Sequence, residues 1–147
     1  MAMMHHPAGM RRLAPWLVWV LLLSACSVGS PDAETVRKIV DQFYQAQQQQ
    51  DMDAALKFFS DDRSPETWRL HLQNISKSLG KVERYEFKRV EVNTVFSGRF
   101  YIFEYQVAYS SGTDAKETIT VYDKVESEGQ PAIVSQVISA DGYQPLF

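Results

Sequence analysis

Two residues, His71 and Asp123, combine a side chain that can transfer a proton with a predicted position near the core. His71 is the only histidine beyond residue 6, and it flanks an apolar helical stripe. A histidine can act as a general base, although a lone histidine in such a place is more often a packing residue. Asp123 shares its strand parity with Ile119, Val121 and Val125, so it is predicted on an apolar face. Desolvation there would raise its pKa, unless it lies at a strand end and reaches solvent or a lysine.

The same inventory argues against metal and cofactor chemistry. With His71 alone and no cysteine after Cys26, the usual zinc sites cannot be assembled. Acidic pairs such as Asp51 with Asp53 lack the spacing of a calcium loop, and helix caps or turns explain them better. Glycine-rich phosphate loops and a Gly-x-Ser-x-Gly elbow are absent from the sequence. We therefore predict no metal and no cofactor.

The composition describes one ordinary globular domain with a short additional segment. The 147 residues are 45% hydrophobic and 12% aromatic, which is too apolar for a disordered chain. The net charge of −3 means that the chain has no excess of basic residues. A pair such as Lys88-Arg89 is too small a basic cluster to bind nucleic acid. No nucleic-acid partner is expected.

The sequence predicts helices in the first half of the domain and strands in the second half. Apolar residues at helical spacing predict a first helix capped by Ser30, a short second helix capped by Asp51, and a third helix from Ser64-Pro65 to Gly80. From residue 81 the period changes, and turn residues separate four predicted strands at 82–96, 99–109, 116–126 and 132–140. Short connections make neighbouring strands antiparallel. The predicted fold class is α+β, with three helices on one face of a four-stranded sheet.

Alternation in the second strand selects the face that meets the helices. Its inward set is the more apolar one: Tyr101, Phe103, Tyr105, Val107 and Tyr109. A pocket for an apolar ligand could be lined by Tyr44, Trp68, His71, Tyr101 and Tyr105. The simpler alternative is that these side chains pack in the core. The outer face keeps Phe100, Ile102 and Tyr122, so a protein partner or a second copy could cover it.

Residues 1–25 have the layout of a secretory signal peptide. Arg11 and Arg12 are the only charged residues before Asp32, and an apolar run of 13 residues, Leu13 to Ala25, follows them. A spanning helix needs about 20 such residues. Translation could begin at Met1 or at Met10, which directly precedes the arginines.

Leu23-Ser24-Ala25-Cys26 resembles the lipobox of bacterial lipoproteins. The resemblance implies cleavage after residue 25, acylation of Cys26, a tether over residues 26–31 and a domain over residues 32–147. Several acyl chains attach a protein stably to a bilayer, whereas one is marginal. Ser27 favours the outer membrane, with the domain facing the periplasm. The alternative is an ordinary signal peptide in which Cys26 is incidental.

The mature chain also resembles the nuclear transport factor 2-like superfamily, which includes ketosteroid isomerase and SnoaL-type cyclases. The resemblance rests on four segments: Phe43-Tyr44-Gln45-Ala46, Asp51-Met52-Asp53-Ala54-Ala55-Leu56, residues 101–107 and residues 116–122. It implies a curved sheet that wraps as a cone around helices, often a pocket at the open end, and often dimers through the outer sheet face. It departs at the last strand, where Gln130-Pro131-Ala132-Ile133-Val134 replaces the usual aromatic residue.

These observations favour a membrane-anchored cell-envelope lipoprotein with a non-catalytic ligand- or protein-binding domain. One alternative is an isomerase or cyclase, because the resemblance implies that Asp123 in the cone could shuttle a proton beside Tyr44, Tyr101 and Tyr105. Another alternative is an accessory subunit of an envelope complex. A deep pocket where Asp123 and Tyr105 converge would favour the enzyme, whereas a cone filled by aromatic side chains would favour the other two.

Overall fold

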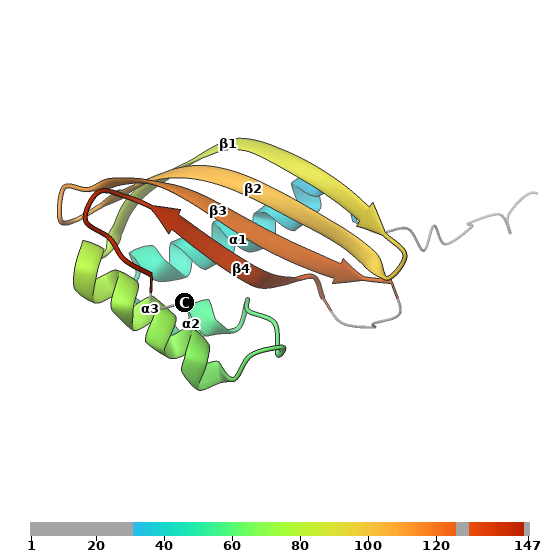
Figure 1. The fold of residues 1–147 in the computed structure, drawn as a ribbon, viewed down its shortest axis with the longest axis horizontal. Coiled ribbons are helices and arrows are strands. Elements are labelled where there is room, and N and C mark those ends of the chain that lie inside the picture. The colour runs from blue at the N-terminus through green and yellow to red at the C-terminus, as the bar shows by residue number, and fades with distance from the viewer. Residues whose placement is uncertain (1–30, 126–129, 146–147) are drawn as a thin grey trace, which may run out of the picture.

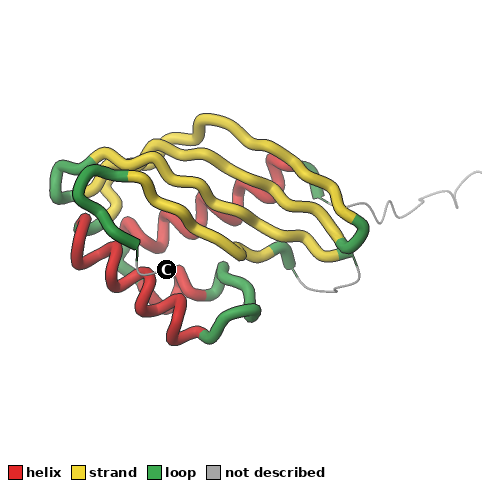
Figure 2. Tube along the Cα trace, in the orientation of Figure 1, coloured by secondary structure: helices red, strands yellow, loops and turns green. Residues whose placement is uncertain are grey.

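The computed structural model describes residues 31–125 and 130–145, so Cys26 and Ser30 lie outside the described residues. The helices α1 (Ala33–Gln48), α2 (Met52–Leu56) and α3 (Pro65–Leu79) precede the strands β1 (Val82–Val95), β2 (Gly98–Tyr109), β3 (Asp114–Lys124) and β4 (Ala132–Ser139). The sheet order follows the sequence, and all neighbouring strands are antiparallel. The helices cover one face of a curved sheet (Figures 1 and 2). The predicted α+β fold class is confirmed.

Polar caps fix where the helices begin. Asp51 and Ser64 cap α2 and α3 as predicted. The prediction for α1 was wrong, because its cap is Asp32, which accepts a hydrogen bond of 2.7 Å from the backbone N–H of Thr35. A carboxylate satisfies a free N–H and also interacts favourably with the positive end of the helix.

Two glycines lie where a side chain would not fit. Gly80 ends α3 with φ of 86°, and a Cβ there would lie 2.1 Å from the hydroxyl oxygen of Ser110. A Cβ on Gly98 would lie 2.2 Å from the backbone oxygen of Asp123 in the neighbouring strand. Gly98 is already paired in β2, so the β1–β2 turn falls at Phe96 and Ser97, one residue earlier than predicted.

The inner face of the sheet carries the core. All five inward residues predicted for β2 are buried, and Glu117, Ile119, Val121 and Asp123 of β3 join them. Val125 was predicted on this face, but it is 65% exposed because β3 ends before it, at Lys124.

The start of β4 is held without the aromatic residue that the family resemblance leads one to expect. Ile133 is fully buried and forms a parallel bridge with Phe59. Its N–H donates to the carbonyl oxygen of Phe58 at 2.7 Å, and its own carbonyl accepts from Ser60 N–H at 2.9 Å. The segment after α2 therefore supplies the packing partner for this strand.

Candidate functional site

A fully buried carboxylate, Glu117 on β3, lies at the centre of a hydrogen-bonded cluster. The hydroxyl of Tyr44 on α1 and the amide of Gln136 on β4 each donate to Glu117 Oε2 at 2.9 Å, and the hydroxyl of Tyr109 on β2 donates to Oε1. The Nε2 of His71 on α3 lies 3.2 Å from the Oε1 of Gln136. We call these five residues the Glu117 cluster.

Burial governs the electrostatics of the Glu117 cluster. It raises the pKa of Glu117, while the hydrogen bonds from Tyr109, Gln136 and Tyr44 act in the opposite direction. Burial also raises the pKa of both tyrosines, and the nearby carboxylate adds to that shift. The pKa of His71 is lowered by burial. Each group therefore favours its uncharged form more than it would in water, which is a property of catalytic sites and of structural networks alike.

The carboxylate of Glu117 is enclosed by the core. Glu117 and Tyr44 are fully buried, and Tyr44 stacks on Tyr85 with ring centroids 4.8 Å apart. Glu117 lines neither the surface hollow beside Gln47 nor the one beside Arg63. A substrate could reach this carboxylate only if core side chains moved aside.

The five predicted ligand residues do not line one pocket. Tyr44 and His71 belong to the Glu117 cluster, whereas Trp68 stacks on Phe59 with centroids 4.2 Å apart. The hydroxyl of Tyr101 donates to the carbonyl oxygen of Pro31, and that of Tyr105 donates to a carboxylate oxygen of Asp41 at 2.9 Å. All five are buried core residues, so packing accounts for their positions.

Asp123 does not converge with Tyr44 and Tyr105, which lie beside Glu117. It lies six residues beyond Glu117 on β3, or about 20 Å along a strand, and it is paired in register with Arg99. Tyr105 is paired with Glu117 instead. Sequence reasoning therefore found the correct face and missed the carboxylate. The parity shared with Ile119 and Val121 was the available signal, because it also places Glu117 inward.

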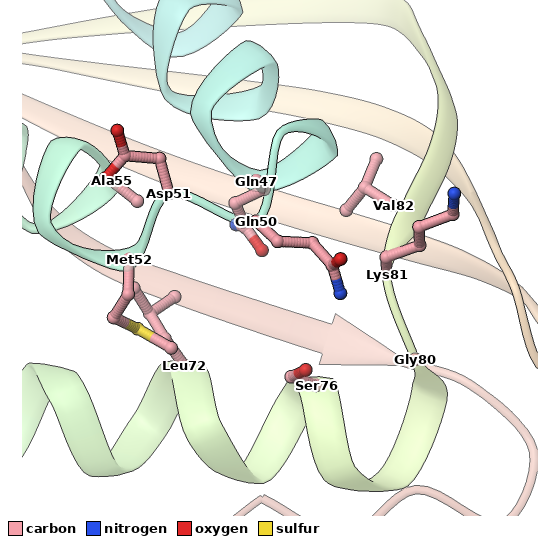
Figure 3. Close-up of a pocket in the computed structure, with 10 residues that line it drawn as sticks. All are labelled: Gln47, Gln50, Asp51, Met52, Ala55, Leu72, Ser76, Gly80, Lys81 and Val82. Atoms are coloured by element: carbon pink, nitrogen blue, oxygen red, sulfur yellow. The ribbon is translucent and has the colours of Figure 1, made fainter.

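The larger hollow lies where the ends of α1 and α3 approach the start of β1 (Figure 3). Its volume is about 410 Å³, including the part that opens to solvent. The lining combines an apolar floor with polar side chains. The floor is Met52, Ala55, Leu72 and Val82, and the polar lining is Gln47, Gln50, Asp51, Ser76 and Lys81. We call this the Gln47 hollow.

Gln47 gives this hollow a free donor. Its Nε2 atom is buried and has no hydrogen-bond acceptor among the described residues. The neighbouring Gln48 differs, because its Nε2 donates to the carbonyl oxygen of Glu83 at 2.8 Å. Gln50, which also lines the hollow, has φ of 56°, an uncommon conformation for a residue other than glycine. A buried donor without an acceptor costs about 1–3 kcal/mol, so a ligand oxygen bound there would recover that free energy.

A second hollow, of about 300 Å³ including open solvent, is lined by Arg63, Trp68, Ser135, Gln136 and Val137. It reaches Gln136, at the edge of the Glu117 cluster. Within residues 31–125 and 130–145, no group of three or more His, Cys, Asp or Glu side chains is arranged to hold a metal ion. No helix in those same ranges is long and apolar enough to cross a bilayer.

The outer sheet face is partly apolar. Phe100 and Tyr122 stack with ring centroids 4.4 Å apart, and Ile102 is half-buried beside them. The nearby Glu104 pairs with Arg89 and with Lys116, and these cations lower the pKa of Glu104 to about 2.

Comparison with solved structures identifies the fold. A protein of unknown function with a cystatin-like fold from Nostoc punctiforme is similar with a TM-score of 0.60 at 13% identity, covering 81% of this chain and 98% of that one. A nuclear transport factor 2-like protein of unknown function from Pseudomonas putida gives 0.53 at 12%, covering 78% and 93%. This chain has the nuclear transport factor 2-like fold.

Two other solved structures that are similar to this chain differ in size and assignment. Bd1075 of Bdellovibrio bacteriovorus gives a TM-score of 0.52 at 12% identity, covering 76% of this chain but only 41% of that one. A Novosphingobium aromaticivorans protein, provisionally assigned as an aromatic ring hydroxylase, gives 0.54 at 11%, covering 74% and 92%. No protein-family model and no curated protein matches the chain. One fold can host many unrelated sites, so these likenesses define architecture and not activity.

Proposed function

We propose that this chain is a lipid-anchored cell-envelope protein, attached through Cys26, whose nuclear transport factor 2-like domain binds a ligand without catalysing a reaction. The filled interior of the cone supports the non-catalytic part. A general acid or base must reach the proton that it transfers. Glu117 is enclosed by its own donors, and Asp123 lines neither hollow.

The Gln47 hollow is the best supported binding site. Its apolar floor suits an aliphatic or aromatic group, and the unpartnered Nε2 of Gln47 suits a carbonyl or carboxylate oxygen on the same ligand. A small molecule or the end of a peptide would satisfy both.

The anchor is tested with Cys26→Ser in the full chain. We expect this variant to lose labelling by a palmitate analogue and to leave the membrane fraction. Ser27→Ala is the matched control, because it keeps the cysteine and should keep the label. Labelling of Cys26→Ser at the wild-type level would refute the anchor.

Ligand binding is tested by NMR on the lipidated protein, titrated with short-chain fatty acids and N-acetylated amino acids. We expect chemical-shift changes around the Gln47 hollow that Gln47→Met removes and Gln48→Ala keeps. Shifts centred on Glu117 and Tyr109 would support the isomerase or cyclase alternative instead, with Glu117 in place of Asp123 as the acid.

The outer sheet face supports the accessory-subunit alternative. Phe100, Ile102 and Tyr122 form one apolar patch, and Val137 on the same face is 58% exposed. If a second copy or a partner covers this patch, Ile102→Glu should lower the mass of the detergent-solubilised assembly. An unchanged monomer mass for both wild type and variant would argue against a second copy there.

A further inference from the structure

The turn between β1 and β2 carries an exposed apolar patch. Phe96 is fully exposed, Val95 is 44% exposed, and Val125 at the end of β3 is 65% exposed. Val125 lies beside the turn, because its N–H donates to the carbonyl oxygen of Ser97 at 3.1 Å. Isolated exposed apolar residues are ordinary, but three of them at one end of a sheet are a candidate interaction site. We call Val95, Phe96 and Val125 the apolar tip.

The apolar tip is built on an ordered turn. The hydroxyl of Tyr122 lies 2.9 Å from both the carbonyl oxygen and the hydroxyl of Ser97. Val95 is paired with Gly98 across the turn, and Gly98 fits closely against the backbone of β3. The backbone therefore holds Phe96 outward from the end of the sheet.

The chain enters the domain at this same end. Tyr101 donates a hydrogen bond to the carbonyl oxygen of Pro31, and it is paired with Val92. Val92 is three residues from Val95, or about 10 Å along the strand. Figure 1 shows the start of α1 and the β1–β2 turn at one end of the domain. Cys26 precedes Pro31 by five residues, which span at most about 18 Å.

We propose that the apolar tip inserts into the surface of the bilayer to which Cys26 is attached. This inference rests on the anchoring proposed above. An acylated Cys26 would hold the tip within reach of the lipid surface, and such tethering makes even a weak contact persistent. Aromatic and aliphatic side chains are stabilised at that surface by burial of apolar area.

The charges around the tip indicate apolar docking. Beside the apolar tip, the cation Arg99 is paired in the sheet register with the acid Asp123. Attraction to anionic lipid is therefore not the driving force, and the contact should form equally well on neutral vesicles.

The contact would also orient the domain. The Gln47 hollow lies at the start of β1 and the apolar tip at its end. A strand of 14 residues is about 40 Å long along its path, at about 3.3 Å per residue. Docking through the tip therefore points the hollow away from the membrane, where a ligand can reach it.

The test uses the full lipidated protein in phosphatidylcholine vesicles. The mature chain has no cysteine other than Cys26, so Val95→Cys gives a single reactive thiol for an environment-sensitive fluorophore. Leu70→Cys on α3 is the control, because Leu70 is 56% exposed and α3 lies beneath the sheet, away from the β1–β2 turn (Figure 1). We expect a blue shift, and quenching by brominated lipids, at position 95 and not at position 70. Replacing half of the lipid with phosphatidylglycerol should leave both signals unchanged.

Phe96→Asp in the labelled Val95→Cys protein should abolish the quenching while flotation with the vesicles is kept. A water-exposed label at position 95 in protein that floats would overturn the tip contact and leave the anchor standing. Protein that does not float would overturn both. A shift that appears only at high protein density would assign the tip to a second copy and overturn the lipid contact.

Discussion

Glu117 and Gln47 both place polar atoms inside the protein, but their surroundings differ. Three side chains donate to the Glu117 carboxylate, whereas the Nε2 of Gln47 finds no acceptor among the described residues. The donors around Glu117 come from α1, β2 and β4, so the carboxylate ties a helix to the sheet. Gln47 lies at the end of one helix, beside a hollow.

The difference is between a polar group whose hydrogen bonds hold the core together and a donor that, in the function proposed above, a ligand would satisfy. A perturbed pKa in the core would ordinarily mark Glu117 as a functional residue. The three donors that surround its buried carboxylate instead indicate a structural role, because satisfied buried networks stabilise and specify a core. Substitutions at the two sites should therefore change stability in opposite directions.

The largest effect is expected for Glu117→Ala. Removal of the carboxylate leaves Tyr44, Tyr109 and Gln136 without their acceptor and opens a cavity, so the free energy of unfolding should fall by about 3–5 kcal/mol. Urea denaturation measures the change. Glu104→Ala is the control on the outer face of the sheet, and its loss should be much smaller. If the Glu117→Ala variant were more stable than wild type, a structural role for Glu117 would be contradicted, because residues that lower stability are typical of active sites.

Stability should also depend on pH through Glu117. Its folded pKa is raised above the ordinary value of 4.5, so the unfolded chain releases the proton first. This contribution is complete below pH 4.5 and is lost as the pH rises toward the folded pKa. His71 has the opposite effect on stability, because its pKa is lowered and the fold loses stability as the pH falls below 6.5. Urea denaturation between pH 4.5 and 8 should show a decline in wild type that Glu117→Gln lessens. Identical slopes would mean that the carboxyl titrates normally.

The sequence predicts most of the fold because its signals are local. Alternation in β2 identified the five buried residues from Tyr101 to Tyr109, and Asp51, Ser64 and Gly80 marked helix boundaries correctly. Alternation in β1 was mixed because its pairing with β2 shifts register twice, near Arg84 and near Arg89. Each shift of one residue turns the following side chains to the other face.

The Glu117 cluster was not predictable in the same way. Its members lie at positions 44, 71, 109, 117 and 136, with no local motif that joins them. Asp123 and Glu117 have the same parity, so alternation cannot rank one above the other. Only the register of β3 against β2 places Tyr105 opposite Glu117 and Arg99 opposite Asp123.

A smaller change in stability, of opposite sign, is expected for a substitution in the Gln47 hollow. Gln47→Met keeps the length of the side chain and removes the unpartnered donor, so stability should stay level or rise by up to about 1 kcal/mol. Gln48→Ala breaks the bond to Glu83 and should lower stability slightly. Thermal unfolding without ligand compares the two variants. A clear loss of thermal stability for Gln47→Met would show that the Gln47 amide already has a partner, such as ordered water. The contrast between Gln47 and Glu117 would then be weaker.

The smallest effect is expected for Asp123→Asn. Asparagine keeps the size of the side chain and one acceptor oxygen, and Asp123 touches no member of the Glu117 cluster in the register of the sheet. The free energy of unfolding should change by less than about 1 kcal/mol, and membrane attachment should not change. Urea denaturation and fractionation measure the two. A folded, membrane-bound Asp123→Asn protein that has lost its envelope function would show that a carboxylate far from both regions carries the activity, and neither Glu117 nor Gln47 would then mark the site.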